Sequence, residues 1–176
     1  MTDETLRCPI GKFIVPEAYT DELMAQWKKD IKALPALMRE AVKDLSDEQL
    51  ETPYRPGGWT IRQVVHHVAD SHINSIIRFK WTMTEDNPTI KAYHEDRWAK
   101  LADYKLPIEP SLIMLEGIHA RLTALFESFT ADDWNRTFFH PEMNVTLPLR
   151  RVLGIYAWHG KHHLAHIAQA KRSFKA

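Results

Sequence analysis

Trp158-His159-Gly160-Lys161-His162-His163-Leu164-Ala165-His166 is the stretch that decides the fold and the chemistry expected of this chain. Four of the chain's ten histidines lie in it, and the sequence on both sides predicts a helix. Residues four apart on a helix lie one turn apart on the same face, so His159 and His163 form a pair. His162 and His166 form another pair, turned about 60° away. Either pair can offer two imidazole nitrogens to one ion, at about 2.1 Å from each.

A second histidine cluster, His66-His67-Val68-Ala69-Asp70-Ser71-His72, lies earlier in the chain. It falls in a helix predicted over residues 60–85, which the capping-box pattern Thr60-Ile61-Arg62-Gln63 opens. Interiors of helical bundles hold metals on side chains from facing helices. We therefore expect these two helices to face each other and to bind one divalent metal ion per chain. Three histidine ligands would leave positions open for water or substrate.

Helical position favours one histidine of the earlier cluster. His67 lies on a polar stripe with Ser71 and Asn74, which indicates the wall of a wet cavity. His66 lies one turn before Asp70, where the two side chains can form an ordinary hydrogen bond. His67 is the favoured ligand, although spacing alone leaves His66 open.

Helical position also separates the two terminal pairs. A stripe through Tyr156, His159 and His163 has the spacing of a buried face, and His162 lies off it. This favours His159 and His163 as ligands. His166, on the same stripe, is expected to be a deeper group behind the ligands or at the substrate.

The composition argues against several other functions. Lysine and arginine number 23, as do aspartate and glutamate, so no broad positive charge favours nucleic acid. No apolar run is long enough to span a membrane, and the acidic start Met1-Thr2-Asp3-Glu4-Thr5 has no signal-peptide core. Cys8 is the one cysteine and cannot form an internal disulfide. We expect one cytoplasmic domain, residues 1–176, that acts on a small-molecule substrate.

The remaining pattern predicts an all-α four-helix bundle. Its long helices are expected over residues 20–45, 60–85, 111–129 and 148–173. Pro35 should kink the first of them, because it lacks an amide N–H. Residues 1–19 predict a surface arm, and residues 87–110 a long excursion between the second and third helices, with a short helix at 98–104. Residues 137–147 predict a small hairpin.

Longer motifs around these histidines carry a family resemblance. They are Thr52-Pro53-Tyr54-Arg55-Pro56-Gly57-Gly58-Trp59-Thr60-Ile61-Arg62-Gln63-Val64-Val65-His66-His67-Val68-Ala69-Asp70-Ser71-His72, Ile77-Arg78-Phe79-Lys80 and Tyr156-Ala157-Trp158-His159-Gly160-Lys161-His162-His163-Leu164-Ala165-His166-Ile167. With them the chain resembles the YfiT branch of the DinB-like superfamily over essentially its whole length. The resemblance implies an up-down-down-up bundle, a homodimer and a metal-dependent hydrolase.

The resemblance also implies which residues hold the metal. The three ligand positions of the family match His67, His159 and His163, the residues that helical position favours. The ion implied is zinc or nickel, with waters completing its shell. In the excursion the family carries a Tyr-Asp-Glu-x-x-Trp pattern. This chain reads Tyr93-His94-Glu95-Asp96-Arg97-Trp98 there, so His94 stands where an acid is expected.

A hydrolase that activates water on a metal needs a base and groups that hold the substrate. Glu95, on the excursion, is the candidate base. Asp70 is the candidate for orienting a ligand histidine through a hydrogen bond. Substrate contacts are predicted for Tyr54, Arg55, Asn74 and Arg78.

Two alternatives use the same histidines. Superfamily members resemble thiol S-transferases, in which the metal holds a low-molecular-weight, bacillithiol-like thiol as its thiolate for conjugation to an electrophile. The other alternative is a non-catalytic metal-binding protein associated with stress. It predicts a closed coordination sphere without a cavity, whereas an enzyme needs a pocket beside the ion.

Overall fold

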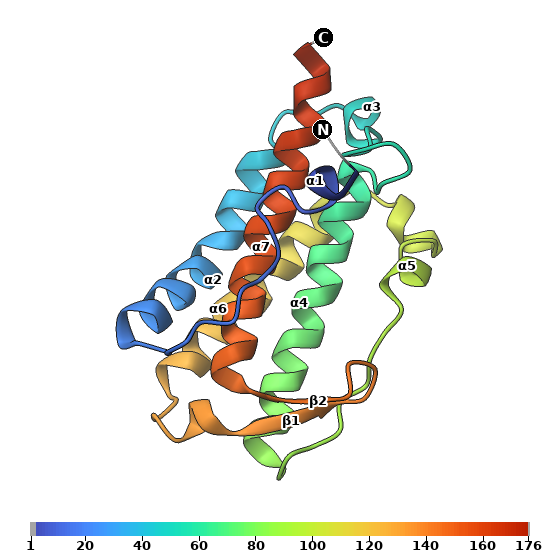
Figure 1. Ribbon diagram of the computed structural model, residues 1–176. Coiled ribbons are helices and arrows are strands. Elements are labelled where there is room, and N and C mark those ends of the chain that lie inside the picture. Colours follow the sequence, from blue (N-terminus) through green and yellow to red (C-terminus); the bar gives the residue numbers. More distant parts are fainter. Residues whose placement is uncertain (1–2, 176) are drawn as a thin grey trace.

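Four long helices lie side by side in the computed structural model, which describes residues 3–175 (Figure 1). They are α2 (Asp21–Val42), α4 (Ile61–Thr84), α6 (Glu109–Glu127) and α7 (Leu149–Lys171). Helices α2 and α7 run in one direction, and α4 and α6 run in the other. The predicted all-α bundle with up-down-down-up order is confirmed.

Side-chain caps decide where two of these helices begin. The Thr20 hydroxyl accepts from the Leu23 amide at the start of α2. At the start of α4, the Thr60 hydroxyl accepts from the Gln63 amide, and the Gln63 side chain accepts from the Thr60 amide. This complete capping box fixes the first turn of α4, about two turns before His67.

Each long helix packs against two others. Helix α7 packs against α2 and α4, and α6 packs against the same two helices. Glycine allows α7 to approach α2 closely, since a Cβ added at Gly160 would lie 2.6 Å from Leu34 Cδ2. Helices α4 and α7 are direct neighbours, which is the arrangement that the two histidine clusters need to meet.

Apolar side chains on the inward faces form two buried clusters. One, toward the hairpin end, contains Phe79, Phe126 and Phe138. The other, toward the opposite end, contains Val65 and Leu115. Burial of each such side chain contributes about 1.5–3 kcal/mol relative to exposure, so these clusters hold the helices at fixed distances.

The segment between α4 and α6 is the predicted excursion. It contains the short helix α5 (Glu95–Trp98) and the 3-10 turn η1 (Ala102–Lys105). The helical turn α3 (Asp47–Leu50) precedes α4, and a second 3-10 turn η2 (Asp133–Asn135) follows α6.

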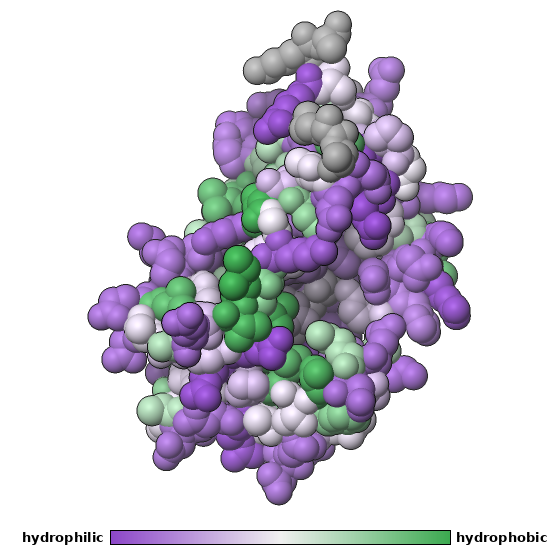
Figure 2. Space-filling model, in the orientation of Figure 1, coloured by the Kyte–Doolittle hydropathy of each residue, from purple (hydrophilic) through white to green (hydrophobic). Residues whose placement is uncertain are grey.

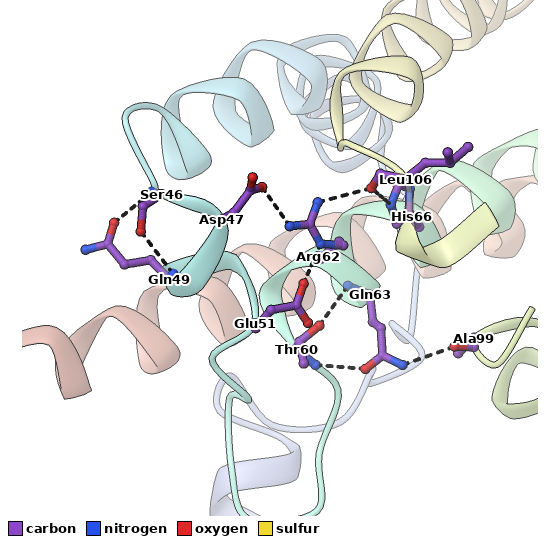
Figure 3. A network of polar contacts seen from close by, with 10 residues as sticks. All are labelled: Ser46, Asp47, Gln49, Glu51, Thr60, Arg62, Gln63, His66, Ala99 and Leu106. Carbon is purple, nitrogen blue, oxygen red and sulfur yellow. Dashed lines mark hydrogen bonds and ion pairs between the residues drawn. The ribbon is translucent and has the colours of Figure 1, made fainter. Parts of the chain in front are cut away.

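Two side chains of α4 hold the excursion against the bundle (Figure 3). Arg62 donates to the Leu106 carbonyl at 3.1 Å and to the Asp47 carboxylate at 2.8 Å. Gln63 donates to the Ala99 carbonyl at 3.0 Å. Both ends of the η1 region are therefore fastened to the first turn of the helix that carries the earlier histidine cluster.

A two-stranded hairpin joins α6 to α7 and confirms the predicted one. Strands β1 (Thr137–His140) and β2 (Val145–Pro148) pair antiparallel, with Phe138 opposite Leu147. Asn144 in the turn has a φ of 52°, a left-handed conformation that asparagine tolerates.

The N-terminal arm lies along the outside of the bundle (Figure 1). It begins with the short helix α1 (Asp3–Arg7), which the sequence pattern does not predict, and residues 1–2 of the predicted arm lie outside the described residues. Trp158 donates to the Gly11 carbonyl at 3.2 Å, and Gln169 donates to the Leu6 carbonyl at 3.1 Å. Both donors belong to α7, so the arm is bound to the helix of the terminal histidines.

A 3-10 turn, η3 (Arg172–Lys175), continues α7 to the last described residue. Within residues 3–175, no helix combines the length and the apolarity that crossing a membrane requires.

Candidate metal centre

Three histidines from two helices meet at one point of the bundle. His67 projects from α4, and His159 and His163 project from α7, with one ring nitrogen of each within 4.8 Å of the other two. His67 Nε2 and His159 Nε2 are 3.2 Å apart. Two nitrogens bound to one tetrahedral ion at about 2.1 Å each are about 3.4 Å apart. This pair therefore has nearly the spacing of two ligands of one ion.

The set of donor atoms fits a transition-metal ion. All three groups are imidazoles, which suit zinc and nickel. His67 Nδ1 is buried and has no hydrogen-bond partner among the described residues. Buried polar atoms are nearly always paired, so the His67 ring is an exception, whereas Nδ1 of His159 and Nδ1 of His163 each contact another histidine.

Burial keeps these imidazoles neutral. Desolvation, with smaller contributions from neighbouring histidines, lowers the pKa of His67 to about 3. The same causes hold the pKa values of His159 and His163 well below the usual value for histidine. A neutral imidazole presents a lone pair, the form that binds a metal ion. At neutral pH the three rings can bind an ion without losing a proton from a charged form.

His166, predicted as a deeper group, lies directly behind His163. The two Nδ1 atoms are 3.3 Å apart, and His166 Nε2 donates to the Arg7 carbonyl at 3.0 Å. Burial lowers the pKa of His166 to about 4, so its neutral ring accepts at Nδ1 and His163 donates. Tyr54 stacks on His166 with ring centroids 3.8 Å apart. The hydrogen bond to the arm and the stack on Tyr54 hold His166 in place, and His166 in turn orients His163.

Two buried histidines for which the sequence predicted no role at the site stand behind His159. His72 Nε2 lies 3.3 Å from His159 Nδ1, and His119 Nε2 lies 2.9 Å from His72 Nδ1. The spacing of His72 predicts only a core position, and His119 lies on the apolar face of α6. A buried polar ring needs a hydrogen-bond partner. One histidine on the apolar face of α4 and one on the apolar face of α6 were therefore the sequence signal for a contact between them.

The three histidines open on a cavity of about 930 Å³. Its wall includes Tyr54 and Arg55, both predicted to contact the substrate, and Trp59, whose ring centroid lies 4.5 Å from that of His67. Glu95 is exposed and also borders the cavity. Figure 2 shows the surface hollowed beside the arm on this face. A cavity of this size can hold a small molecule.

Asp70 does not orient one of the three histidines. Its Oδ2 accepts from the Tyr104 hydroxyl at 2.6 Å, and it borders a separate cavity of about 160 Å³. The predicted bond from His66 to Asp70 is also wrong, because the His66 ring contacts the Ser111 hydroxyl at 2.7 Å and the Leu106 carbonyl at 3.2 Å. Around the axis of α4, His66 lies about 100° and Asp70 about 60° from His67, on the same side of it.

Asn74 and Arg78 are not among the residues that border the large cavity. The Asn74 side chain donates to the Asp70 carbonyl within α4 at 2.8 Å, and Arg78 donates to the Tyr156 hydroxyl at 3.0 Å. They lie about two and three helical turns beyond His67, toward the hairpin end. The structure therefore does not support the substrate contacts predicted for them.

His94 is the exposed N-cap residue of α5, and its side chain makes no capping hydrogen bond. Aspartate is among the residues that cap helices best. The acid that the family pattern carries at this position thus fits a structural role in starting α5. Glu95, the next residue, is the acid that borders the cavity.

Comparison with known proteins finds one family model and several relatives. A family model described as the DinB superfamily matches residues 18–167. The chain is 52% identical over 167 residues to a Bacillus cereus protein named "Putative metal-dependent hydrolase", covering 95% of this chain and 96% of that protein. It is 51% identical, with the same coverage, to a Bacillus anthracis protein of the same name.

Two solved structures share the fold. YfiT from Bacillus subtilis, described as "a probable metal-dependent hydrolase with an unusual four-helix bundle topology", matches with a TM-score of 0.94 at 42% identity, over 97% of this chain and 98% of that one. A mycothiol-dependent maleylpyruvate isomerase matches with a TM-score of 0.66 at 15% identity, over 82% of this chain and 60% of that one. The second likeness extends to the fold alone.

Proposed function

Since this chain belongs to the DinB superfamily, we propose that it is a metal-dependent hydrolase. His67, His159 and His163 are the proposed ligands of one Zn²⁺ or Ni²⁺ ion. The observation that carries the proposal is the meeting of three neutral imidazoles at the wall of a cavity of about 930 Å³. The names of the Bacillus relatives support the same activity.

The chain's own groups supply what hydrolysis needs besides the ion. A divalent ion at these nitrogens supplies Lewis acidity, which lowers the pKa of water toward about 7. Glu95 is the proposed base, because its exposed side chain borders the cavity on which the three histidines open. Arg55 pairs with Asp3 at 3.3 Å and donates to the Pro56 carbonyl. Its contact with the arm closes one side of the mouth.

Metal analysis of the purified protein, followed by titration with Zn²⁺ and Ni²⁺, tests the ligand set. Removal of a group that hydrogen-bonds to a metal ligand typically lowers metal affinity by roughly 10–100-fold. We expect His163→Ala, which removes a ligand itself, to lower the metal affinity by more than that. His162→Ala is the matched control, because His162 stacks on Trp158 at 4.5 Å and lies outside the three-nitrogen group. Equal losses in both variants, or no binding by the parent, would contradict the proposed centre.

A panel of esters and amides tests hydrolysis by the metal-loaded protein. Glu95→Gln should lower kcat by about 10²–10⁴-fold, the usual contribution of a general base, while metal affinity stays unchanged. Asp96→Asn removes the neighbouring carboxylate and is the matched control. If Glu95→Gln behaves like Asp96→Asn, Glu95 is not the base. If the loaded parent cleaves no substrate of either class, the hydrolase proposal fails.

Thiol transfer is a second candidate, favoured by the size of the cavity. Ligand pockets usually measure about 300–1,000 Å³, and this one, near 930 Å³, can hold a bacillithiol-like thiol together with an electrophile. A divalent ion favours the thiolate form of a thiol. Incubation of the loaded protein with such a thiol and a halogenated acceptor, beside the ester and amide panel, separates the two reactions by their products.

The cavity argues against the non-catalytic alternative, which predicts no open space beside the three histidines. The homodimer that the family resemblance implies stays a prediction, and analytical ultracentrifugation of the purified protein measures it.

A further inference from the structure

From His159 of the proposed centre, a continuous line of hydrogen bonds runs through two fully buried histidines to one main-chain carbonyl. His159 Nδ1 lies 3.3 Å from His72 Nε2, and His72 Nδ1 lies 2.9 Å from His119 Nε2. His119 Nδ1 lies 2.5 Å from the Ile31 carbonyl oxygen. The four residues belong to α7, α4, α6 and α2 in that order, so each helix of the bundle contributes one.

These contacts lie where water cannot replace them. The exposed fraction is 0% for His72 and 2% for His119. The two rings stack with centroids 4.8 Å apart, and Tyr156 packs edge-on against His72. Loss of a partner at such a place leaves a polar atom both buried and unpaired, which is costly.

The Ile31 carbonyl decides which atom donates in each of these hydrogen bonds. A carbonyl oxygen only accepts, so His119 Nδ1 carries a proton and Nε2 of this neutral ring is an acceptor. His72 must then donate from Nδ1 and accept at Nε2, and His159 must donate from Nδ1. The lone pair of His159 is left on Nε2, the atom that lies 3.2 Å from His67 Nε2.

The sequence of α2 explains why that carbonyl is available. In an α-helix the carbonyl of residue 31 accepts from the amide of residue 35. That residue is Pro35, which has no N–H and lies well inside α2. The Ile31 carbonyl therefore has no helical donor and takes His119 as its donor instead.

We propose that His72 and His119 are positioning residues that hold His159 in its Nδ1–H tautomer, anchored on the Ile31 carbonyl that Pro35 leaves without a helical donor. The inference rests on the proposed metal centre, which gives the tautomer its purpose. A ring whose Nε2 lone pair is already set needs no proton shift before it binds an ion. Groups that fix ligand histidines in this way typically contribute about 10–100-fold to metal affinity.

The tautomer can be measured without any metal. Long-range ¹H–¹⁵N correlation spectra of the metal-free parent should show His159 and His119 protonated at Nδ1. A His159 ring protonated at Nε2 overturns the proposal whether or not the protein binds metal. Failure of the chain of histidines and failure of the metal centre are therefore distinguishable.

His119→Gln and His119→Met form a matched pair of variants. The glutamine amide offers a donor and an acceptor, so it can still join the Ile31 carbonyl to His72, whereas methionine is similar in shape but offers no donor and only a weak acceptor. We expect His119→Gln to keep the Zn²⁺ and Ni²⁺ dissociation constants close to those of the parent. His119→Met should raise them by about 10–100-fold and give His159 a mixture of tautomers.

Equal dissociation constants for the parent and both variants overturn the proposal. If circular dichroism shows that His119→Met does not fold, the tautomers of the parent and of His119→Gln decide the question. If the parent binds neither ion, the metal centre fails, and the tautomer spectra still test the chain of histidines.

Discussion

Pro35 lies four residues after Ile31 inside α2, and the Ile31 carbonyl accepts its hydrogen bond from His119 instead of from the helix. A proline in a helix interior costs about 3 kcal/mol relative to alanine. Here the proline supplies a free acceptor to another helix of the bundle. Pro35 weakens α2 locally, but it makes possible a line of hydrogen bonds that joins all four long helices.

Pro35→Ala tests this relationship. The new amide N–H competes with His119 for the Ile31 carbonyl, so we expect weaker Zn²⁺ binding. The unfolding free energy of the metal-free protein should change little, because the gained helix propensity, about 3 kcal/mol, offsets the lost burial of the ring and the weakened hydrogen bond of His119. Isothermal titration and urea unfolding measure the two effects. Pro110→Ala, at the first turn of α6 where no helical donor is needed, is the control. Unchanged Zn²⁺ binding in Pro35→Ala would argue against competition.

Stability of the metal-free protein should decrease as the pH falls below about 6.5. The pKa of His67 is lowered to about 3, and those of His119 and His166 to about 4, each mainly by burial. As the pH falls through the unfolded value near 6.5, the unfolded chain binds protons that the folded protein does not. Each histidine then removes about 1.4 kcal/mol of unfolding free energy per pH unit, down to its folded pKa. Urea unfolding at several pH values between 7.5 and 5 measures this slope.

His119→Gln provides the control for that slope. It removes one histidine with a lowered pKa, so the dependence of unfolding free energy on pH should become shallower by about 1.4 kcal/mol per pH unit. Stability that does not change between pH 7.5 and pH 5 would mean that these rings are protonated in the folded protein as readily as in the unfolded chain.

His94→Asp should stabilise α5. Aspartate can accept from the free amides of the first turn, which is worth about 1 kcal/mol at an N-cap. The amides of Arg97 and Trp98, which bond to the carbonyl of residue 94, should exchange their hydrogens several-fold more slowly. His94→Asn should act in the same direction, and His94→Ala should not. Equal exchange in all four proteins would show that capping does not limit the opening of this helix.

Gly160→Ala should separate α7 from α2. The new Cβ would lie 2.6 Å and 2.9 Å from the two Leu34 methyl carbons, and Leu34 is only 3% exposed. We expect a loss of about 1–3 kcal/mol of unfolding free energy, as is usual for overpacking, together with weaker metal binding. Gly117→Ala is the control, because a Cβ at that position in α6 meets nothing within 4 Å, and it should stabilise the protein slightly. The double variant Gly160→Ala with Leu34→Ala should lose less than the sum of the two single losses.

Local signals were enough to predict the helices and the meeting of the two histidine clusters. The capping box at Thr60 and Gln63 marks the start of α4, and it forms as the pattern indicates. The four-residue spacing of His159 and His163 places both rings on one face of α7, toward His67. Both inferences depend on the geometry of a single helix, which the sequence carries directly.

Contacts between helices needed more than local pattern. The bond between His119 and His72 exists because α6 packs against α4, and spacing within either helix does not contain that fact. The predicted contact of Asp70 with a ligand histidine is wrong for the same reason. Its carboxylate accepts a hydrogen bond from Tyr104 on the excursion, and spacing within α4 does not contain that contact. Histidines on apolar faces mark where such partners must be sought, but only the packing of the bundle identifies them.

If any one of the four helices slid by a single residue, about 1.5 Å, it would lengthen or misalign at least one of the contacts that join His159, His72, His119 and the Ile31 carbonyl. The affinity for an ion should therefore report the axial alignment of the whole bundle. Core substitutions remote from the ligands should alter ion binding before they visibly lower the melting temperature, so a metal titration would serve as a sensitive assay of packing in this protein.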